Sequence, residues 1–306
     1  MIEKCIRLLR DPKYRFAVLS DYGFLNKMSD EKFLKKKFRL LMGYPLDLEN
    51  PRTFNEKLQW LKLHDHNPLY TTMADKYAVK EYVSQKIGAQ YVIPNLGVWE
   101  RAEDIDFKEL PDQFVLKCTH DSHGLVICKD RSKLDEEKAR KTLREGLKQN
   151  YYQKFREWPY KDIKPRIIAE QYMEDDTGEE LRDYKVLCFG GEPKLIELHQ
   201  GRYSDHPTQD YYDVEWKRSE ISQGQLRKYH TSGKDFPKPP VLDEMLRCSR
   251  ILSEGIPHIR VDWYCVSGKL YFGELTFYDG AGFAPFDKKE YDLLLGSWIK
   301  LPGKES

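Results

Sequence analysis

The amino-acid sequence predicts an α+β fold, in which helices pack against antiparallel sheets. Three observations support this class: the first 52 residues carry helical periodicity, two apolar strand-like segments flank a polar loop after residue 113, and another such pair follows residue 257. The chain has 306 residues, of which 40% are hydrophobic and 33% are charged. That is enough for one large domain or for two smaller domains with their own hydrophobic cores.

Helices are expected first in the N-terminal part of the chain. Residues 30–42 place their apolar side chains on one face. The sequence Thr53-Phe54-Asn55-Glu56 is a capping-box pattern, so a second helix should begin at Phe54. An acidic residue suits a helix N-terminus, which predicts another helix start at Asp75. Later helices are predicted at residues 134–149, at residues 242–254 and after Asp287, which should cap the last one.

Strands are expected where short apolar runs are bounded by turn signals. Residues 119–124 join two such runs and Gly190-Gly191 joins two others, so each pair should form a hairpin. Residues 200–239 are polar and are predicted to form long loops with little regular structure, which in a compact domain are often functional. The predicted strands cover residues 91–94, 114–118, 125–128, 166–172, 184–189, 194–199, 258–266 and 269–275.

The charge of the chain is nearly balanced but unevenly distributed. The formal net charge is +1, so no overall field attracts nucleic acid, and none is expected as a partner. Residues 1–52 contain 12 Lys and Arg against 7 Asp and Glu, an excess of +5 that peaks at residues 35–39. This excess is either the solvated face of a helix or a contact with an acidic polymer or an anionic membrane surface.

Cysteine usage and hydropathy indicate a compartment. The six cysteines form no C-x-x-C pair, and the sequence contains neither a signal-peptide pattern nor an apolar run long enough to span a bilayer. We therefore expect a cytoplasmic protein with reduced thiols. The basic N-terminal segment leaves open a position at the inner face of the membrane.

The last predicted hairpin carries the strongest local signal for chemistry. Strand alternation places Arg260, Asp262 and Tyr264 on one face, and Glu274 and Thr276 on one face of the partner strand. If Asp262 lies beside Glu274, the two carboxylates repel each other, so a cation should lie between them. Oxygen ligands with open positions suit Mg²⁺ bound to nucleotide phosphates, and Arg260 would neutralise phosphate oxygens. The alternative is a surface hairpin with an ordinary Arg–Asp ion pair.

Two further residues sit in apolar strands and need polar partners. Lys117 could reach a phosphate at the start of the polar loop 119–124, whose amides would add donors. The alternative is an edge-strand lysine that extends to water. Glu170 ends an apolar strand and could accept a hydrogen bond from an adenine amino group, or the strand could simply run into an acidic loop.

In chain order, these segments resemble the ATP-grasp superfamily. The elements that carry the resemblance are Ala74-Asp75-Lys76-Tyr77-Ala78-Val79-Lys80, Phe114 to Lys117, Ala169-Glu170-Gln171-Tyr172-Met173, Asp183-Tyr184-Lys185, and the pair Arg260-Val261-Asp262 with Glu274-Leu275-Thr276. A closer likeness, to TupA-like ATP-grasp proteins of teichuronopeptide biosynthesis, covers roughly residue 45 to the C-terminus. It rests on Asn50-Pro51-Arg52-Thr53-Phe54-Asn55-Glu56-Lys57-Leu58-Gln59-Trp60, Arg182-Asp183-Tyr184-Lys185 and Gly273-Glu274-Leu275-Thr276-Phe277-Tyr278.

The resemblance implies an ATP-grasp fold, with two α+β subdomains that grip ATP and a helical N-terminal region. Residues 1–52 would form that region, residues 53–112 a pre-ATP-grasp region, and residues 113–306 the ATP-grasp domain. The domain would divide into a small subdomain at about 113–170 and a large subdomain at about 171–306.

The resemblance also implies roles for individual residues. Arg260 and Lys117 would be catalytic, and Arg260 would stabilise an oxyanion. The metal ligands for Mg²⁺ would be Asp262, Glu274 and Thr276. The ATP-binding residues would be Lys76, Lys117, Ser122, His123, Gly124, Glu170, Gln171, Tyr172, Met173, Asp183, Lys185 and Arg202.

The implied activity is that of an ATP-dependent carboxylate–amine ligase that forms an amide through an acyl phosphate. The resemblance suggests an amino acid as the amine and a uronic acid of a bacterial surface or capsular polysaccharide as the carboxylate, handled near a membrane-bound assembly. We expect these substrates near Arg202, Tyr203, His206, Tyr211 and Tyr212.

Two departures from the family pattern, Thr276 in place of asparagine and Asp121 in the phosphate loop, keep a non-catalytic ATP-binding protein as an alternative. The other alternative is a sugar-nucleotide glycosyltransferase, because Asp104-Ile105-Asp106 fits the metal-binding pattern D-x-D.

Overall fold

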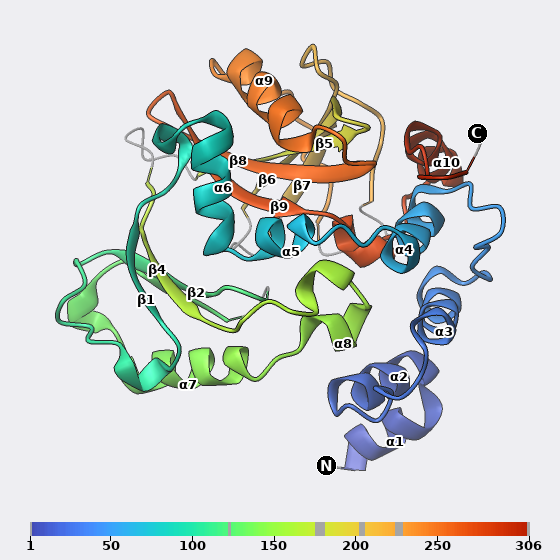
Figure 1. Cartoon of the computed structure of the whole chain (residues 1–306), viewed down its shortest axis with the longest axis horizontal. Coiled ribbons are helices and arrows are strands. Elements are labelled where there is room, and N and C mark those ends of the chain that lie inside the picture. Colours follow the sequence, from blue (N-terminus) through green and yellow to red (C-terminus); the bar gives the residue numbers. More distant parts are fainter. Residues whose placement is uncertain (1, 122–123, 175–180, 202–205, 224–228, 305–306) are drawn as a thin grey trace.

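The computed structural model describes residues 2–121, 124–174, 181–201, 206–223 and 229–304. Helices and two antiparallel sheets make up the chain, which confirms the predicted α+β class (Figure 1). None of the helices in these ranges is both long enough and apolar enough to cross a membrane.

Three helices begin the chain: α1 (Ile2–Arg10), α2 (Pro12–Asp21) and α3 (Asp30–Met42). The bounds of α3 agree with the predicted helix. Buried Phe33 and Phe38 of α3 pack in one small core with Phe283 from near the C-terminus. The N-terminal helices are therefore anchored to the last part of the chain.

Helix α4 (Phe54–His64) begins at the predicted capping box. The Glu56 backbone N–H donates to Oγ1 of Thr53 at 3.2 Å, and the Thr53 backbone N–H donates to Oε2 of Glu56 at 3.0 Å. Each side chain thus satisfies a backbone donor that the first helical turn leaves open.

The segment after α4 differs from the prediction. Helices α5 (Leu69–Ala74) and α6 (Ala78–Ile87) are separate, and Asp75 ends α5 instead of starting a helix. Its carboxylate accepts the Tyr77 backbone N–H at 2.9 Å and pairs with Arg166 at 2.6 Å, and these contacts hold the turn between the helices. The strand predicted at residues 91–94 is also wrong. A 3₁₀ turn, η1 (Ala89–Tyr91), lies there, and the strand β1 (Asn95–Trp99) follows it.

The four-stranded sheet has the order β1-β4-β2-β3 and contains the predicted hairpin of β2 and β3. Its remaining strands are β2 (Phe114–Cys118), β3 (Leu125–Cys128) and β4 (Ile167–Gln171). Helix α7 (Glu136–Leu147) covers one face, where Sγ of Cys118 lies 3.7 Å from the Leu143 carbonyl oxygen. The shorter elements around this sheet are η2 (Ala102–Asp104), η3 (Arg131–Lys133), α8 (Tyr151–Phe155) and η4 (Trp158–Tyr160).

The five-stranded sheet has the order β7-β6-β5-β8-β9, and all of its pairs are antiparallel. Its strands are β5 (Asp183–Phe189), β6 (Glu192–Gln200), β7 (Thr208–Tyr212), β8 (His258–Val266) and β9 (Lys269–Thr276). Strand β7 is the regular element that the structure describes within residues 201–239, which were predicted to form long loops with little regular structure. Its register against β6 is continuous from Thr208 to Tyr212, and Tyr211 and Tyr212 are both buried.

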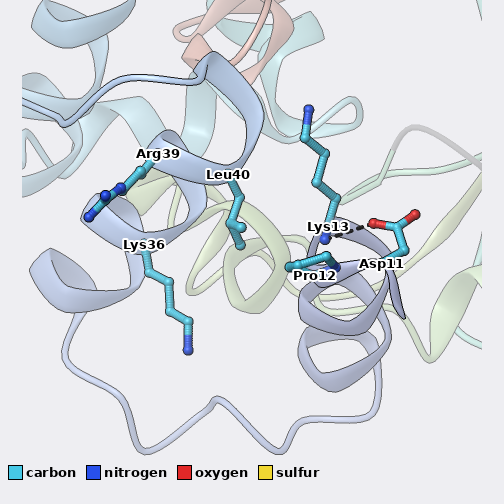
Figure 2. Close-up of a pocket in the computed structure, with 6 residues that line it drawn as sticks. All are labelled: Asp11, Pro12, Lys13, Lys36, Arg39 and Leu40. Carbon is cyan, nitrogen blue, oxygen red and sulfur yellow. Dashed lines mark hydrogen bonds between the residues drawn. The ribbon is translucent and has the colours of Figure 1, made fainter. Parts of the chain in front are cut away.

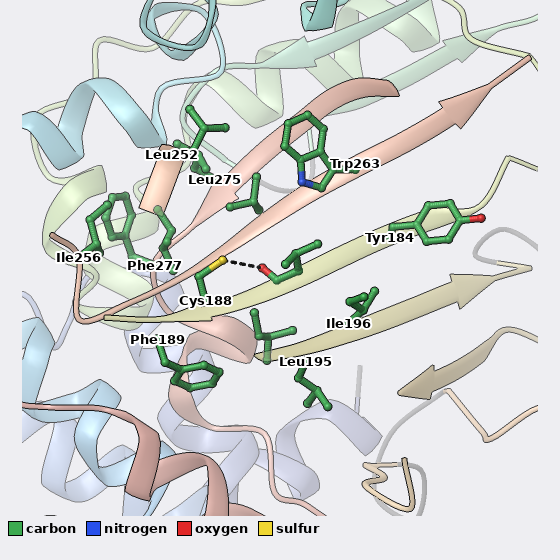
Figure 3. Close-up of a cluster of buried hydrophobic side chains, with 14 of the residues drawn as sticks. Tyr184, Cys188, Phe189, Leu195, Ile196, Leu252, Ile256, Trp263, Leu275 and Phe277 are labelled. Carbon is green, nitrogen blue, oxygen red and sulfur yellow. Dashed lines mark hydrogen bonds between the residues drawn. The ribbon is translucent and has the colours of Figure 1, made fainter. Parts of the chain in front are cut away.

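Helix α9 (Leu242–Ser253) covers one face of this sheet. The face is apolar, as Figure 3 shows for Trp263, Leu275 and their neighbours. The indole N–H of Trp263 donates to Oγ of Ser249 on α9 at 2.8 Å, which fixes the direction of this side chain. Because side chains alternate along a strand, Asp262 and Tyr264 point to the opposite face.

The chain ends with the turn η5 (Asp279–Gly282) and the helix α10 (Lys289–Trp298). Asp287 does not cap α10, which corrects the prediction. Its carboxylate accepts a hydrogen bond from Oγ of Ser222 at 2.6 Å, and Lys288 occupies the cap position.

The two sheets are arranged one above the other, with α9 and α7 on their outer sides (Figure 1). The faces away from these helices carry polar side chains on both sheets. On the small sheet these are Lys117 and Glu170, and on the large sheet they include Lys185 and Asp262. The fold therefore collects the candidate site residues on inner faces. The division into subdomains stays a prediction.

Candidate functional site

One row of polar side chains crosses the inner face of the large sheet. Tyr211 lies opposite Glu197, Glu197 opposite Lys185, and Lys185 opposite Asp262. All four residues are less than one-twentieth exposed. Buried polar groups are stable only when they are paired, so the contacts along this row define what it can bind.

Three oxygens converge on one nitrogen at the β8–β9 end of the row. Nη2 of Arg260 lies 2.8 Å from Oδ2 of Asp262, 3.2 Å from Oε1 of Glu274 and 3.2 Å from Oγ1 of Thr276. These are the three residues predicted as metal ligands. The cation between them in the structure is the guanidinium.

A β-bulge makes this convergence possible. Arg260 lies opposite Thr276, but the register shifts before Trp263, so β9 contains one extra residue opposite Asp262. Gly273 fills this position, and a Cβ there would lie 3.1 Å from the Asp262 carbonyl oxygen. The bulge brings Glu274 beside Asp262, as the predicted pairing of these carboxylates required.

Arg260 makes further hydrogen bonds through its other nitrogens. Its Nε donates to Oδ1 of Asp262 at 2.7 Å, and its Nη1 binds the carboxylate of Asp279. Although burial opposes the charge, Asp262, Asp279 and Glu274 raise the pKa of Arg260 further above its usual range. Asp279 is a site residue that the sequence reasoning did not find. Its only signal is its position three residues after Thr276.

The donor set suits a hard divalent cation. Two carboxylates and a hydroxyl are oxygen ligands, and Mg²⁺ is commonly bound by one or two carboxylates together with substrate phosphates. In the part of the chain that the structure describes, no group of three or more His, Cys, Asp or Glu side chains is arranged to hold a metal. The site would therefore need oxygens from a bound molecule to complete a coordination shell.

Lysines balance the negative charge of this end of the sheet. Nζ of Lys185 lies 2.7 Å from Oδ2 of Asp183 and 2.5 Å from Oδ2 of Asp262. Burial lowers the pKa of Lys185, but the two carboxylates raise it above its usual value. For Glu274, burial and Asp262 raise the pKa, and the charges of Lys76, Arg260 and Lys185 lower it to a net value below normal. The group is thus ionised at neutral pH.

A second charged cluster lies on the small sheet. Lys80 and Lys117 bind the two oxygens of the Glu170 carboxylate at 2.5 and 2.6 Å. Burial raises the pKa of Glu170, but these lysines lower it to about 2. Lys80 was missed by the sequence reasoning, which placed the first phosphate lysine at Lys76. Both carboxylate oxygens of Glu170 already have cationic partners, so its predicted contact with adenine stays a prediction.

The loop after β2 folds around Asp121. The Asp121 carboxylate accepts the Gly124 backbone N–H at 3.1 and 3.2 Å, and its carbonyl oxygen accepts Nζ of Lys76 at 2.6 Å. The Asp121 carboxylate therefore faces the backbone of its own loop. Ser122 and His123 lie outside the described residues.

Other predicted residues are spread more widely. Gln171 ends β4 and donates its backbone N–H to the Pro94 carbonyl oxygen at 3.3 Å, and Tyr172 and Met173 follow it. Among the expected substrate residues, Tyr211 lies on the polar face, but Tyr212 stacks on Trp216 with ring centroids 4.3 Å apart. Arg202 and Tyr203 lie outside the described residues, and His206 lies just before β7.

The D-x-D motif shows no convergence of its carboxylates on a site. Ile105 is buried in the core of the small sheet, Asp104 pairs with Arg101 at 3.8 Å, and Asp106 accepts the Lys108 backbone N–H at 2.9 Å. These contacts stabilise a turn, and they do not favour the glycosyltransferase alternative.

Comparison with known proteins gives one family. Residues 56–300 match the family described as TupA-like ATPgrasp. A search of curated proteins finds no match.

Several solved structures are similar at low identity. The D-alanine–D-alanine ligase from Bacillus anthracis complexed with ATP is 15% identical, with 67% of this chain and 55% of that chain covered and a TM-score of 0.38. The chain therefore spans little more than half the length of that ligase. The D-alanine–D-alanine ligase from Helicobacter pylori is 12% identical, with 81% of this chain and 69% of that chain covered and a TM-score of 0.43. A D-cycloserine synthetase is 14% identical, with 79% of this chain and 78% of that chain covered and a TM-score of 0.40.

Proposed function

Because the chain belongs to the TupA-like ATP-grasp family, we propose that it is an ATP-dependent ligase that joins a carboxylate to an amine. One observation carries the proposal: three oxygens, from Asp262, Glu274 and Thr276, converge on a single positively charged nitrogen of Arg260. An oxygen site that already holds a cation and lies beside Lys185 is suited to a metal–triphosphate complex.

The residues of the large sheet would hold the triphosphate. Asp262, Glu274 and Thr276 would bind Mg²⁺, which when bound neutralises phosphate charge and orients the terminal phosphoryl group. Lys185 and Lys76 would contact further phosphate oxygens, and Lys117 would do so from the small sheet. Catalysis of phosphoryl transfer depends mainly on such positioning and charge stabilisation.

The proposed reaction has two steps. An oxygen of the substrate carboxylate attacks the γ-phosphorus of ATP, the bond to the β,γ-bridging oxygen breaks, and ADP leaves. The amine then attacks the acyl carbon of the acyl phosphate, inorganic phosphate leaves, and the amine loses a proton. Arg260 would stabilise the oxyanion of the second step, and removal of one such donor typically lowers kcat by about 10²–10³.

The proposed substrates rest on the family resemblance. We assign the carboxylate to a uronic acid of a bacterial surface or capsular polysaccharide and the amine to an amino acid. The polar row offers Tyr211 and Glu197 next to the phosphate lysine Lys185, which is a suitable position for a polar substrate.

A cytoplasmic position at the membrane face is also part of the proposal. An open pocket of about 410 Å³ on the N-terminal helices is lined by Lys13, Lys36 and Arg39 together with Asp11, Pro12 and Leu40 (Figure 2). Each Lys or Arg near an anionic membrane surface adds about 1 kcal/mol of attraction, and Asp11 offsets part of what these three residues would contribute. Sedimentation with anionic vesicles, but not with neutral ones, tests this position. Replacement of Lys13, Lys36 and Arg39 by glutamine should abolish sedimentation with the anionic vesicles.

The first experiment is a thermal-shift assay with MgATP on the wild type and on Glu274→Ala, beside a panel of UDP-sugars. Binding to the folded state alone stabilises by about 2.7 kcal/mol at a hundredfold excess of ligand over Kd. We expect a Mg²⁺-dependent shift with ATP that the variant loses, followed by ADP release with a suitable carboxylate–amine pair. A shift with a UDP-sugar and none with ATP would contradict the proposal. ATP binding without turnover across such pairs would favour a non-catalytic protein.

A further inference from the structure

The turn η5, directly after the metal-binding strand, has an unusual backbone. Gly280, Ala281 and Gly282 have φ values of 55°, 55° and 62°, so three consecutive residues are left-handed. Glycine adopts this conformation readily, but alanine is strained there. Such a turn persists only when surrounding contacts hold it in place.

Helix α4 supplies those contacts from one face. Nε2 of Gln59 donates to the carbonyl oxygens of Ala281 and Gly282 at 3.3 and 2.6 Å, and Nζ of Lys62 donates to Ala281 at 2.8 Å. One turn earlier, Asn55 exchanges two hydrogen bonds with the Ala284 backbone, at 3.1 and 3.3 Å. Asn55, Gln59 and Lys62 are spaced by four and three residues, which places them on one face of a helix.

These side chains are buried where helix α4 meets the turn. Asn55 and Gln59 have no exposed surface and Lys62 is 2% exposed. Nζ of Lys62 lies within hydrogen-bond distance of three acceptors, which are the Ala281 carbonyl oxygen, Oε1 of Gln59 and the Phe155 carbonyl oxygen. Burial lowers the pKa of Lys62 to about 7. A Cβ on Gly282 would also lie 2.9 Å from Cβ of Leu58, so the turn and the helix are in close contact.

The same turn begins with Asp279, which binds Nη1 of Arg260. The other nitrogens of Arg260 bind the candidate metal ligands Asp262, Glu274 and Thr276. A continuous set of contacts therefore leads from α4 through the left-handed turn to Asp279, and from there to the guanidinium that occupies the cation position.

We propose that Gln59 and Lys62 are positioning residues for Arg260: by fixing the turn that carries Asp279, they set how readily Nη2 of Arg260 leaves Asp262 and Glu274 when a divalent cation binds. Asp279 gives the guanidinium a second anchor. If the turn shifts, Arg260 relies on Asp262, Glu274 and Thr276 and competes more strongly with the cation. The inference rests on the proposed function, because it concerns the same metal site.

The test measures the Mg²⁺ concentration that gives half of the ATP-dependent thermal shift, so it needs no second substrate. Gln59→Met removes both hydrogen bonds that Nε2 donates to the turn, and it also removes the Oε1 acceptor of Lys62. Lys57→Met is the matched control: it lies on the same helix and donates to the Ile299 carbonyl oxygen at 2.7 Å, away from the turn. We expect Gln59→Met to raise the half-effective Mg²⁺ concentration about fivefold or more. Lys57→Met should change it less than about twofold.

A second variant separates positioning from general destabilisation. Asp279→Asn keeps the size of the side chain and weakens its hold on Arg260, so it should also raise the half-effective Mg²⁺ concentration. If Gln59 acts through Asp279, the double variant should differ little from Asp279→Asn alone, because residues in one chain of contacts are not additive. If Gln59→Met folds poorly, the single variant Asp279→Asn still tests whether the anchor at Asp279 sets the Mg²⁺ requirement.

The outcomes separate the two proposals. If the wild type shows a Mg²⁺-dependent ATP shift and neither Gln59→Met nor Asp279→Asn alters its Mg²⁺ dependence beyond Lys57→Met, the positioning role is wrong and the proposed function stands. Additive effects in the double variant would also overturn the positioning role. If the wild type shows no such shift, the proposed function fails and this inference fails with it.

Discussion

Arg260 and Asp262 lie two residues apart on β8 and bind each other through two hydrogen bonds, Nε to Oδ1 at 2.7 Å and Nη2 to Oδ2 at 2.8 Å. This paired geometry is the strongest form of an Arg–carboxylate contact. It places the guanidinium of Arg260 at the point where the candidate metal ligands meet.

Removal of this guanidinium should make stability depend on Mg²⁺. Arg260→Met removes the cation that Asp262, Asp279 and Glu274 share, and removal of one partner of a buried ion pair typically costs about 3 kcal/mol or more. We expect urea unfolding to show this loss, and millimolar Mg²⁺ to recover part of it without ATP. The wild type should respond little to Mg²⁺ alone. An equal response to Na⁺ at matched ionic strength would indicate screening and contradict the assignment.

Thr276 provides the third oxygen, so its hydroxyl should matter more than its methyl group. Thr276→Val keeps the shape and removes the oxygen, and it should raise the Mg²⁺ requirement for ATP binding by about tenfold. Thr276→Ser keeps the oxygen and should stay close to the wild type. Titration of the ATP-dependent thermal shift with Mg²⁺ distinguishes the two variants. Equal behaviour of both would remove Thr276 from the ligand set.

His258 should make the fold sensitive to mild acid. Burial lowers the pKa of His258 to about 4, although Asp279 opposes the effect. The unfolded chain, with a histidine pKa near 6.5, binds more protons between these values, so stability falls as pH drops from about 6.5 to 4. The loss amounts to about 3 kcal/mol. His258→Gln should remove this slope in urea unfolding measured across the window, and an unchanged slope would show that other groups cause it.

Glu170 should act in a lower pH window. Its pKa of about 2 lies below the usual 4.5, so its contribution is complete above pH 4.5 and is lost as pH falls toward 2. The contribution is about 3 kcal/mol, and Glu170→Gln should flatten the stability profile there by this amount. Exposed Glu109→Gln serves as the control. If both variants follow the wild-type acid profile, the pairs with Lys80 and Lys117 contribute little.

At position 296, glycine should be more stabilising than alanine, although alanine is usually preferred in a helix interior. Alanine normally stabilises a helix interior by about 1 kcal/mol relative to glycine. In α10, however, a Cβ at this position would lie 2.7 Å from the backbone nitrogen of Phe54. We expect Gly296→Ala to lower the free energy of unfolding by about 2 kcal/mol. Ser297→Ala, at the exposed neighbouring position, should stay within about 0.5 kcal/mol of the wild type. A gain in stability at Gly296 would show that α10 can move away from α4.

The sequence predicted the local elements well where one strong signal determined them. The capping box at Thr53 and the hairpins of both sheets came from patterns within a few residues. The first errors arose where contacts between residues far apart in the sequence determine the local structure. Asp75 resembles a helix start, but its pair with Arg166, 91 residues away, holds it in a turn.

At the candidate site, too, the residues that follow a local pattern were predicted and those that depend on distant partners were not. Strand alternation brought Asp262, Glu274 and Thr276 to one face, and the structure places them around one nitrogen. Asp279 and Lys80 could not be found in this way. Their importance comes from partners on other elements, and neither residue carries a periodic signal of its own.

Because a guanidinium lies between Asp262 and Glu274, cation binding at the candidate metal site would exchange one cation for another. Its carboxylates are already neutralised by a cation of the protein, so a free divalent ion gains little by entering alone. A nucleotide changes this balance, because its phosphates offer Arg260 a new anion at the moment when the ion takes its place. Loading of such a site should follow the concentration of the metal–nucleotide complex, and fluctuations of free Mg²⁺ alone should leave it largely unaffected.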